Sequence, residues 1–306
     1  MTDLNQQRHS LVHKALGTKI VLTLFGDQYI PLLQKSMRLI DGYEDRLTVN
    51  REESEVMNIN HAAGRMPKMV SPSTYELIRL AVKYSRENFG FNALIGPLVK
   101  LWKIGFTGAH VPSDGEIKER MHLIDPYKVL LNDDNHTVFL EEAGMELDLG
   151  GIAKGYIADR VRDFWEEHGV PAGIINLGGN LLFVGKSPHR ADGQWVIGVQ
   201  DPRLERGKDI KLVRKPACSA VTSGIYERFL EIKGKRYHHL LDPRTGYPLQ
   251  TELSSVTVFT EQSVMGEIEA KRLFFNNQPI KDWENQPGNL GAVFIDQNEK
   301  VININN

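Results

Sequence analysis

The chain has 306 residues, of which 41% are hydrophobic and 25% are charged, and its formal net charge is −2. These values are ordinary for a globular protein with a sizeable core, and the near-neutral charge gives no reason to expect nucleic acid or a membrane as a partner. Cys218 is the only cysteine, which excludes an intramolecular disulfide and a cysteine-rich zinc site. We interpret Cys218 as a small core residue rather than a nucleophile.

The first ten residues, MTDLNQQRHS, are polar and lack the apolar region of a signal peptide. No run approaches the roughly 18 apolar residues that a membrane-spanning helix needs. We therefore expect the chain as given to be cytoplasmic, unless an export segment was removed before residue 1.

The first half of the chain predicts a strand followed by helices. Residues 18–26 are typical of a strand, and helical spacing of apolar residues predicts helices over 29–47, 73–90 and 150–169. Ser73 is expected to cap the second helix and Gly90 to end it, whereas the third opens on glycines and closes at Gly169. Residues 91–106 are apolar and favour core, with a wall for an aromatic ligand as the alternative. The polar tract 131–151 alternates like strands with turns.

The second half is rich in short β-prone segments separated by turn residues. These predict strands over 172–185, 195–200, 219–224, 228–234, 237–242 and 254–259. A helix over 263–275 follows, and 289–303 closes as a hairpin with its turn near Asp296–Glu299. Because helices come first and antiparallel strands later, we predict an α+β fold of mixed, largely antiparallel sheets with helices packed on them.

Glycine-bearing loops at 148–155, 176–180, 222–224 and 242–246 are the candidate ligand sites. The first leads from a strand into a helix, whose N-terminus offers unpaired N–H groups and the positive end of the helix dipole. Lys154 lies in the first turn, where the dipole disfavours a cation, so an anionic ligand such as a phosphate is indicated. Spacing alone leaves a plain strand–helix turn equally open, and the Gly-Lys-Ser/Thr ending of a P-loop is absent.

Two adjacent histidines, His238 and His239, fall in a predicted strand, so they should point to opposite faces. One of them could serve in a site while the other is a surface or core histidine. Asp242, Pro243 and Gly246 indicate a turn. Ser223 lies beside a glycine, but the Gly-x-Ser-x-Gly elbow of many hydrolases is absent, so positioning a ligand is the favoured role.

Seven segments occur in an order that resembles one family closely. They are LGT (16–18), SEVMNIN (54–60), GPLVKLW (96–102), LDLGGIAKGYIAD (147–159), NLGGN (176–180), AVTSGIYER (220–228) and HHLLDPRTGYP (238–248). Their wording and order resemble the ApbE family, the FAD:protein FMN transferases. We therefore expect one ApbE-like domain over 1–306, with 1–15 as an N-terminal extension and 16–306 as a catalytic domain that leaves room for two subdomains.

The resemblance implies an enzyme that takes FAD as its substrate. Such enzymes cleave the FAD pyrophosphate, attach FMN by a phosphoester bond to a Thr or Ser of an acceptor flavoprotein, typically a flavin-dependent reductase, and release AMP. The family normally uses Mg²⁺. Alternatives are a relative that binds FAD without transferring it, an FAD pyrophosphatase that uses water as the acceptor, and a scaffold protein with no nucleotide ligand.

The resemblance also implies roles for particular residues. Lys154 should contact the pyrophosphate, His239 should act as a general base or orient a phosphate, and Asp242 should support the catalytic set, as should Asp159. The residues expected around FAD are Leu16, Gly17, Thr18, Asn60, Gly150, Gly151, Lys154, Gly178, Gly179, Ser223, His239 and Lys271.

The chain departs from the family pattern at three places. It has no cysteine-tagged export signal, and Leu16 replaces a methionine of similar size. More seriously, the Asp and Thr that hold Mg²⁺ in relatives, together with a carbonyl of the LDLGG loop (here Gly151), correspond to Glu267 and Lys271. Glu267 is a plausible oxygen ligand, but an ammonium group has only donors. One interpretation is that Lys271 takes the place of the metal and is held by Glu267, four residues earlier. The other is that the true metal ligands lie nearby in the sequence. We predict weak or no Mg²⁺ binding at this position.

Overall fold

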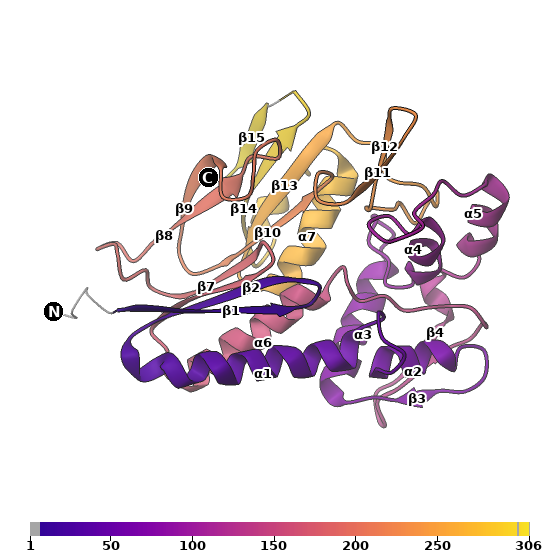
Figure 1. Cartoon of the computed structure of the whole chain (residues 1–306), viewed down its shortest axis with the longest axis horizontal. Helices are drawn as coiled ribbons and strands as arrows, with labels where there is room; N and C mark the ends of the chain where they lie inside the picture. The colour runs from indigo at the N-terminus through magenta and orange to yellow at the C-terminus, as the bar shows by residue number, and fades with distance from the viewer. Residues whose placement is uncertain (1–6, 299, 306) are drawn as a thin grey trace.

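The computed structural model describes residues 7–298 and 300–305. Its centre is an eight-stranded sheet in the order β1-β2-β6-β7-β10-β13-β14-β15, in which every neighbouring pair is antiparallel (Figure 1). The strands are β1 (Arg8–Ala15), β2 (Thr18–Phe25), β6 (Ala172–Leu177), β7 (Asn180–Gly185), β10 (Ser219–Gly224), β13 (Leu253–Thr260), β14 (Asn289–Asp296) and β15 (Val301–Ile304).

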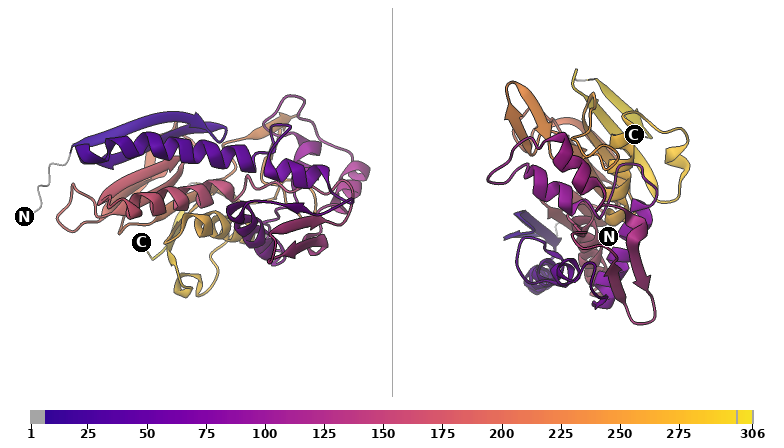
Figure 2. Two further views of the ribbon diagram at one scale, coloured as in Figure 1. Left: turned by 90° about the horizontal axis from the view of Figure 1, so that it is seen from below. Right: turned by 90° about the vertical axis from the view of Figure 1, so that its right-hand side faces the viewer.

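Three helices cover one face of this sheet: α1 (Ile30–Leu47), α6 (Ala153–Glu167) and α7 (Ser263–Asn276). Figure 2 shows α1 and α6 side by side along the sheet. The hairpin of β8 (Trp195–Gln200) and β9 (Asp209–Lys215) covers part of the other face, where Trp195 and Phe183 join an apolar cluster. Because both faces are covered, β10 and β13 are buried along nearly their whole length.

A second group of elements lies at one end of the sheet, at the right of Figure 1. It contains a three-stranded sheet in the order β3-β5-β4, several helices and a separate hairpin, β11–β12. The elements are α2 (Glu55–His61), β3 (Lys68–Met69), α3 (Pro72–Ser85), α4 (Gly96–Trp102), α5 (Asp114–Met121), a 3₁₀ turn (Pro126–Lys128), β4 (Val129–Asn132), β5 (Thr137–Leu140), β11 (Phe229–Ile232) and β12 (Lys235–His238). The other 3₁₀ turns, Asp27–Tyr29 and Trp283–Asn285, contact α1 and β14 instead.

The predicted α+β class is confirmed, but the limits of α3 were wrong. The helix is capped at Ser71 rather than Ser73, because Pro72 fills its first position, and it ends at Ser85 instead of reaching Gly90. Gly90 has φ 123°, which a helix does not admit, and a Cβ there would lie 2.1 Å from the ring of Phe275. The glycine is needed for close packing against α7, not as a helix stop.

The segment before residue 16 contributes to the main sheet. Strand β1 pairs with β2 over its full length, from Arg8 opposite Phe25 to Ala15 opposite Thr18. Its outer edge is exposed, so its residues carry a weak apolar signal, and the sequence prediction treated it as an extension. Strand β9 was also missed, and 237–242 is a strand only as far as His238. The final hairpin is confirmed, although Glu299 of its predicted turn lies outside the described residues.

Candidate active site

Two tight turns meet at one end of the main sheet. Leu16 and Gly17 join β1 to β2 with φ of 54° and 67°, and Gly178 and Gly179 join β6 to β7 with φ of 67° and 100°. A Cβ on Gly178 would lie 2.4 Å from the side chain of Thr18, so the two turns touch. The structure thus brings together five residues that the sequence assigned to the FAD pocket.

Asn60 fastens the loop that leads into α6. Its Nδ2 donates to the carbonyl of Leu147 at 2.9 Å, and its Oδ1 accepts from the Leu147 N–H at 2.8 Å. Further along this loop, Asp148 Oδ1 accepts from the Gly150 N–H at 2.8 Å. Because both ends of the Asn60 amide are occupied, this side chain positions the loop.

The N-terminus of α6 is open toward the same region. No side chain caps it and its first turn holds no acidic residue, but Lys154 lies there. One position later, a Cβ on Gly155 would lie 2.4 Å from the carbonyl oxygen of Ser263 and 2.8 Å from Cγ of Glu267. Glycine therefore lets α6 and α7 approach closely, and this approach brings Lys154 to Glu267.

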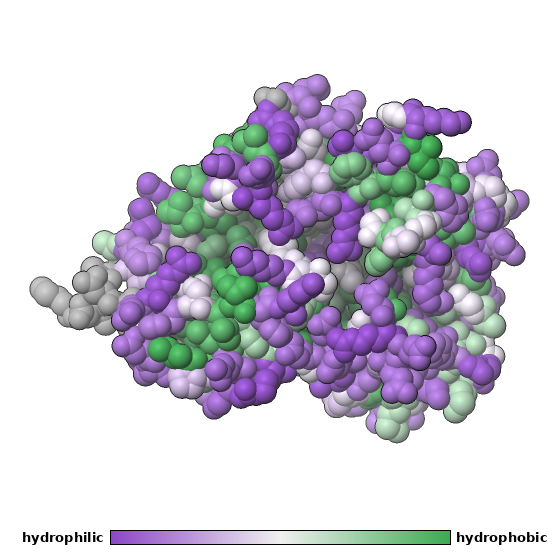
Figure 3. Space-filling view, viewed as in Figure 1, coloured by the Kyte–Doolittle hydropathy of each residue, from purple (hydrophilic) through white to green (hydrophobic). Residues whose placement is uncertain are grey.

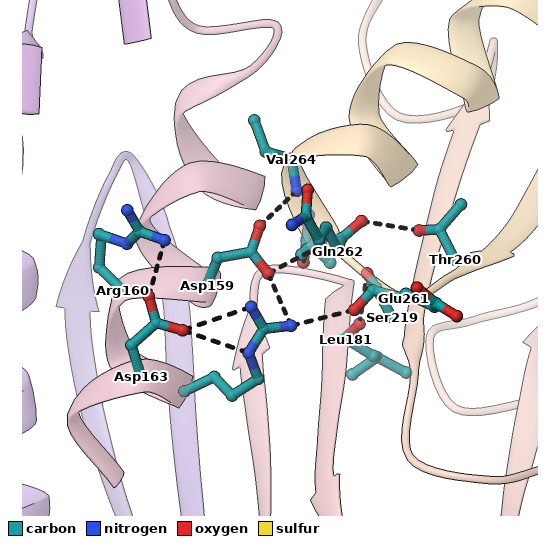
Figure 4. A network of polar contacts seen from close by, with 12 residues as sticks. Asp159, Arg160, Asp163, Leu181, Ser219, Thr260, Glu261, Gln262 and Val264 are labelled. Carbon is teal, nitrogen blue, oxygen red and sulfur yellow. Dashed lines mark hydrogen bonds and ion pairs between the residues drawn. The ribbon is translucent and has the colours of Figure 1, made fainter. Parts of the chain in front are cut away.

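Asp159 fixes the start of α7 from the side of α6, as Figure 4 shows. Its two carboxylate oxygens accept from the N–H groups of Ser263 at 2.9 Å and Val264 at 2.8 Å. Gln262, the N-cap residue, provides no side-chain cap of its own. The Arg162 guanidinium lies 3.3 Å from the same carboxylate. Asp159 thus holds α7 in register with α6, in keeping with the supporting role predicted for it.

A cluster of three charged residues around the buried Glu267 carboxylate lies where α6, α7 and the Gly150–Gly151 loop meet. Glu267, only 4% exposed, is within 3.6 Å of the Lys154 ammonium and 3.1 Å of the Lys271 ammonium. Asn180 donates its amide N–H to the same carboxylate at 3.0 Å, and the Ser263 hydroxyl in turn donates to Asn180 Oδ1 at 2.8 Å. Two cations share one carboxylate here, so the cluster has an excess positive charge.

Burial and the neighbouring charges act on the pKa values in opposite directions. Burial alone raises the pKa of the Glu267 carboxyl, but Lys154, Lys271 and the Asn180 amide outweigh it and bring the pKa down to about 2. Burial, together with the charge of Lys154, lowers the pKa of Lys271, and the charge of Glu267 opposes this shift without cancelling it. Glu267 is therefore ionised throughout the neutral range.

The two histidines point to different partners. His238 is the last residue of β12 and is 6% exposed, with Nε2 2.8 Å from the Leu249 carbonyl. His239 follows the strand and is half-buried, with Nδ1 3.2 Å from the Arg228 carbonyl. Burial, together with the charges of Arg228 and Lys271, lowers the pKa of His239 to about 4. Because a carbonyl oxygen only accepts, Nδ1 of His239 carries the hydrogen, and Nε2 of the neutral ring has a free lone pair.

Asp242 organises the turn at 242–246. Its carboxylate accepts from the Arg244 side chain at 2.8 and 2.7 Å and from the Arg244 N–H at 2.9 Å, and it is 5% exposed. It therefore positions the segment after His239. Ser223, on β10 opposite Val256, is also buried.

The oxygen atoms expected for Mg²⁺ are already bound to an ammonium group. Lys271 Nζ lies 2.6 Å from the Gly151 carbonyl oxygen and 3.1 Å from Glu267 Oε2. Mg²⁺ requires oxygen donors at about 2.0–2.1 Å in near-octahedral geometry, and Lys271 supplies none. Within 7–298 and 300–305 there is also no group of three or more His, Cys, Asp or Glu side chains arranged to hold a metal. The residues present do not fit the ion.

Two further expectations concern Cys218 and the segment 91–106. Cys218 is 1% exposed, and burial raises the pKa of its thiol to about 12, so it is a core residue. Phe91, Leu98 and Trp102 are buried, as expected for core, whereas Phe106 at the end of 91–106 is 48% exposed. No helix among the described residues combines the length and apolar character needed to cross a bilayer.

Sequence reasoning missed Asn180 as a part of the charge cluster. It stands in the NLGGN segment, where attention fell on the glycines, and its contact with Glu267 spans 87 residues. A polar residue that opens a buried strand was the available signal, because such a residue needs a hydrogen-bonding partner.

Known proteins resemble the chain over most of its length. The model of the ApbE family matches residues 16–294. A Klebsiella pneumoniae protein named FAD:protein FMN transferase is 44% identical over 94% of this chain and 89% of its own length. A Treponema pallidum protein of the same name is 37% identical over 79% and 70%, respectively.

Solved structures agree in fold. An ApbE protein from Thermotoga maritima superposes with a TM-score of 0.88 at 28% identity, covering 97% of this chain and 96% of that one. The apo form of a Pseudomonas stutzeri flavinyl transferase superposes with a TM-score of 0.82 at 23% identity, covering 99% of this chain and 96% of that one. This second similarity concerns the fold alone. The α+β architecture of this chain is thus shared with solved structures. The chain belongs to the ApbE family.

Proposed function

We propose that this protein is an FAD:protein FMN transferase. Its membership of the ApbE family and its 44% identity to a protein of that name support the activity. The structural observation that carries the proposal is the convergence of Lys154 and Lys271 on the Glu267 carboxylate, beside the start of α6, which no side chain caps. A pyrophosphate needs this combination of cations and N–H groups, because phosphoryl transfer depends mainly on positioning and charge stabilisation.

The reaction joins an acceptor hydroxyl to the FMN half of FAD. The hydroxyl oxygen of an acceptor Thr or Ser forms a bond to the phosphorus on the FMN side of the pyrophosphate. The bond from that phosphorus to the bridging oxygen breaks, and the bridging oxygen leaves with its electron pair on AMP. The proton of the hydroxyl passes to a base, so the products are a phosphoester-linked FMN, AMP and one proton.

His239 is the base that we propose. Its Nδ1–H is directed to the Arg228 carbonyl, which leaves Nε2 to accept a proton, and its pKa of about 4 keeps the ring neutral at pH 7. Lys154 has a side chain 32% exposed, so its ammonium can reach a bound phosphate. Asp242 and Asp159 are positioning residues in this proposal, since their carboxylates are bound to Arg244 and to the start of α7.

The FAD pocket that we propose lies in front of these groups. Figure 3 shows a recess in the middle of the face seen in Figure 1, with hydrophilic residues along its border. The turns at Leu16–Thr18 and Gly178–Gly179, the Gly150–Gly151 loop and Ser223 are its proposed lining, and Asn60 holds the loop in place. The acceptor is expected to be a flavin-dependent reductase, and the cytoplasmic location remains a prediction.

The test is flavin attachment in a purified system. The protein, FAD and a flavin-dependent reductase encoded in the same genome are incubated together, and the intact mass of the reductase is measured along with AMP. We expect a mass increase equal to FMN less one water on a Thr or Ser, and an equal amount of AMP. The matched control is a reductase with that Thr or Ser replaced by Ala, which should gain no mass.

Other outcomes separate the alternatives. Release of FMN and AMP without any adduct, with all reductases tried, would identify an FAD pyrophosphatase. FAD bound intact with no AMP would identify a flavin-binding relative without transferase activity. Either result would contradict the proposed transferase.

A further inference from the structure

The ammonium group of Lys271 has a complete set of protein partners. Its three acceptors are the Gly151 carbonyl oxygen at 2.6 Å, the Glu267 carbonyl oxygen at 3.1 Å and Glu267 Oε2 at 3.1 Å. An ammonium group has three hydrogens, so each can be directed to one acceptor. The Lys271 side chain is 12% exposed, which means that the charge is held in place rather than extended into solvent.

The surrounding chain is shaped to admit this lysine. A Cβ on Gly151 would lie 3.3 Å from Cε of Lys271, tight enough to crowd the side chain, so a glycine keeps the path open. Asn180 and Lys154 bind Oε1 of Glu267, which leaves Oε2 for Lys271. Contacts from three separate segments of the chain therefore shape this position for one fixed monovalent cation.

We propose that Lys271 serves as a built-in cation, so that this protein binds FAD and transfers FMN without a divalent metal ion. The inference rests on the proposed function and concerns how the same site supplies positive charge. The argument is the contact set: the two kinds of oxygen atom that would attract a metal, a carbonyl and a carboxylate, are both bound by the lysine.

The charge of the cluster fits this role. Lys154 and Lys271 together carry two positive charges and Glu267 one negative charge, so the cluster retains a net charge of +1. When the bond to the bridging oxygen breaks, negative charge grows on the departing AMP phosphate, and a fixed positive charge nearby stabilises it. Because the hydrogens of Lys271 are all directed to protein acceptors, it acts through its charge, whereas Lys154, with a side chain 32% exposed, can also contact the phosphate directly.

The first experiment removes metal ions. The purified protein is treated with EDTA, and FAD binding is measured by calorimetry with EDTA or with Mg²⁺; AMP release and the FMN adduct are measured under the same conditions. We expect the dissociation constant and the rate to agree within about twofold, a difference below 0.5 kcal/mol. A loss of about tenfold or more in EDTA that Mg²⁺ restores would overturn the inference.

The second experiment replaces the lysine. In Lys271→Thr, the carbonyl of Gly151, the Glu267 carboxylate and a new hydroxyl provide oxygen atoms for an ion. With FAD present, we expect Mn²⁺, followed by electron paramagnetic resonance, to bind this variant at least about tenfold more tightly than the unaltered protein. We also expect its FMN transfer to become dependent on added metal.

Two further variants control for the loss of any lysine and for misfolding of Lys271→Thr. Lys128→Thr removes a lysine that is paired with Glu142 at the surface and should change neither Mn²⁺ binding nor metal dependence. If Lys271→Thr does not fold, Lys271→Met keeps the length of the side chain without its charge and should bind FAD more weakly with or without Mg²⁺. Unaltered protein that binds Mn²⁺ as tightly as Lys271→Thr would contradict the inference.

The two proposals fail in distinguishable ways. Transfer that occurs only with Mg²⁺ would refute the built-in cation and leave the transferase standing. The absence of any FMN adduct under every metal condition would refute the transferase itself.

Discussion

Glu267 is the residue on which the site depends most, because two ammonium groups share its buried carboxylate. Its spacing from Lys271 predicted an ion pair, and the structure confirms one at 3.1 Å. What spacing did not reveal is the burial: a surface pair at this spacing contributes only tenths of a kcal/mol, whereas removing one member of a buried pair is costly.

Glu267→Gln should therefore destabilise the fold substantially. The buried Lys271 ammonium and the partly exposed Lys154 ammonium would lose their counter-charge, so we expect the free energy of unfolding at pH 7 to fall by about 3–5 kcal/mol, measured by urea denaturation. Glu142→Gln is the matched control, because Glu142 pairs with Lys128 at 2.7 Å but has a side chain 43% exposed; its effect should be below about 1 kcal/mol. Equal effects from the two variants would contradict the assigned importance of the cluster.

The pH dependence of FMN transfer should follow His239. A general base must be unprotonated, and its pKa is about 4, so the rate should be flat near neutral pH and fall as the pH drops through about 4. His239→Asn should slow transfer by about 10²–10⁴-fold and abolish that acid limb. Circular dichroism at each pH checks that the protein is still folded, and His110→Asn, at an exposed histidine, should behave as the unaltered protein does. An acid limb that persists in His239→Asn would exclude His239 as the base.

At the scale of elements, the close approach of α6 and α7 assembles the site. Gly155 permits the contact, and Asp159 fixes its register by accepting from the first N–H groups of α7. The charges of Lys154 on α6 and of Glu267 and Lys271 on α7 are then brought together. Neither helix could build this cluster alone.

Asp159→Asn tests this register. The amide keeps one acceptor oxygen but loses the charge and one acceptor, so we expect a loss of about 1–3 kcal/mol in the free energy of unfolding. Because α7 carries Lys271, FAD should also bind more weakly. Asp163→Asn, one turn later on α6 and 39% exposed, weakens pairs with Arg160 and Arg162 but leaves the contacts of Asp159 with α7 intact, so it should cost less than about 1 kcal/mol (Figure 4). Unchanged FAD affinity in Asp159→Asn would show that the register of α7 does not govern the site.

The sequence predicted the features that depend on neighbouring residues and missed those that depend on contacts between distant residues. The helix over 263–275 and the glycines at the start of α6 were predicted because periodicity and turn residues are local. The contact between Lys271 and the Gly151 carbonyl joins residues 120 apart, and Asp159 reaches Ser263 across 104 residues. Such contacts leave no trace in local spacing, so only the ordered family motifs pointed toward the region.

At the scale of the whole molecule, the proposed site lies between the main sheet and the second group of elements at its end. The β1–β2 and β6–β7 turns come from the sheet, whereas Asn60, on α2, comes from the other group and holds the loop before α6. The strand β1 thus matters twice, since it completes the sheet edge and ends in the turn that touches Gly178.

A chain that begins at Leu16 tests the contribution of β1 to the whole. It would lose the complete β1–β2 ladder, the packing of α1 against β1 and the contact between His13 and Asp41. We expect the unfolding free energy to fall by about 2–4 kcal/mol, which for a chain of this size lowers the melting temperature by roughly 3–6 °C. The turn at Leu16–Thr18 would lose its first strand, so stabilisation by saturating FAD should shrink as well. A shortened chain with the melting temperature and FAD response of the full chain would show that β1 is dispensable, and that residues 1–15 are an extension in the functional sense after all.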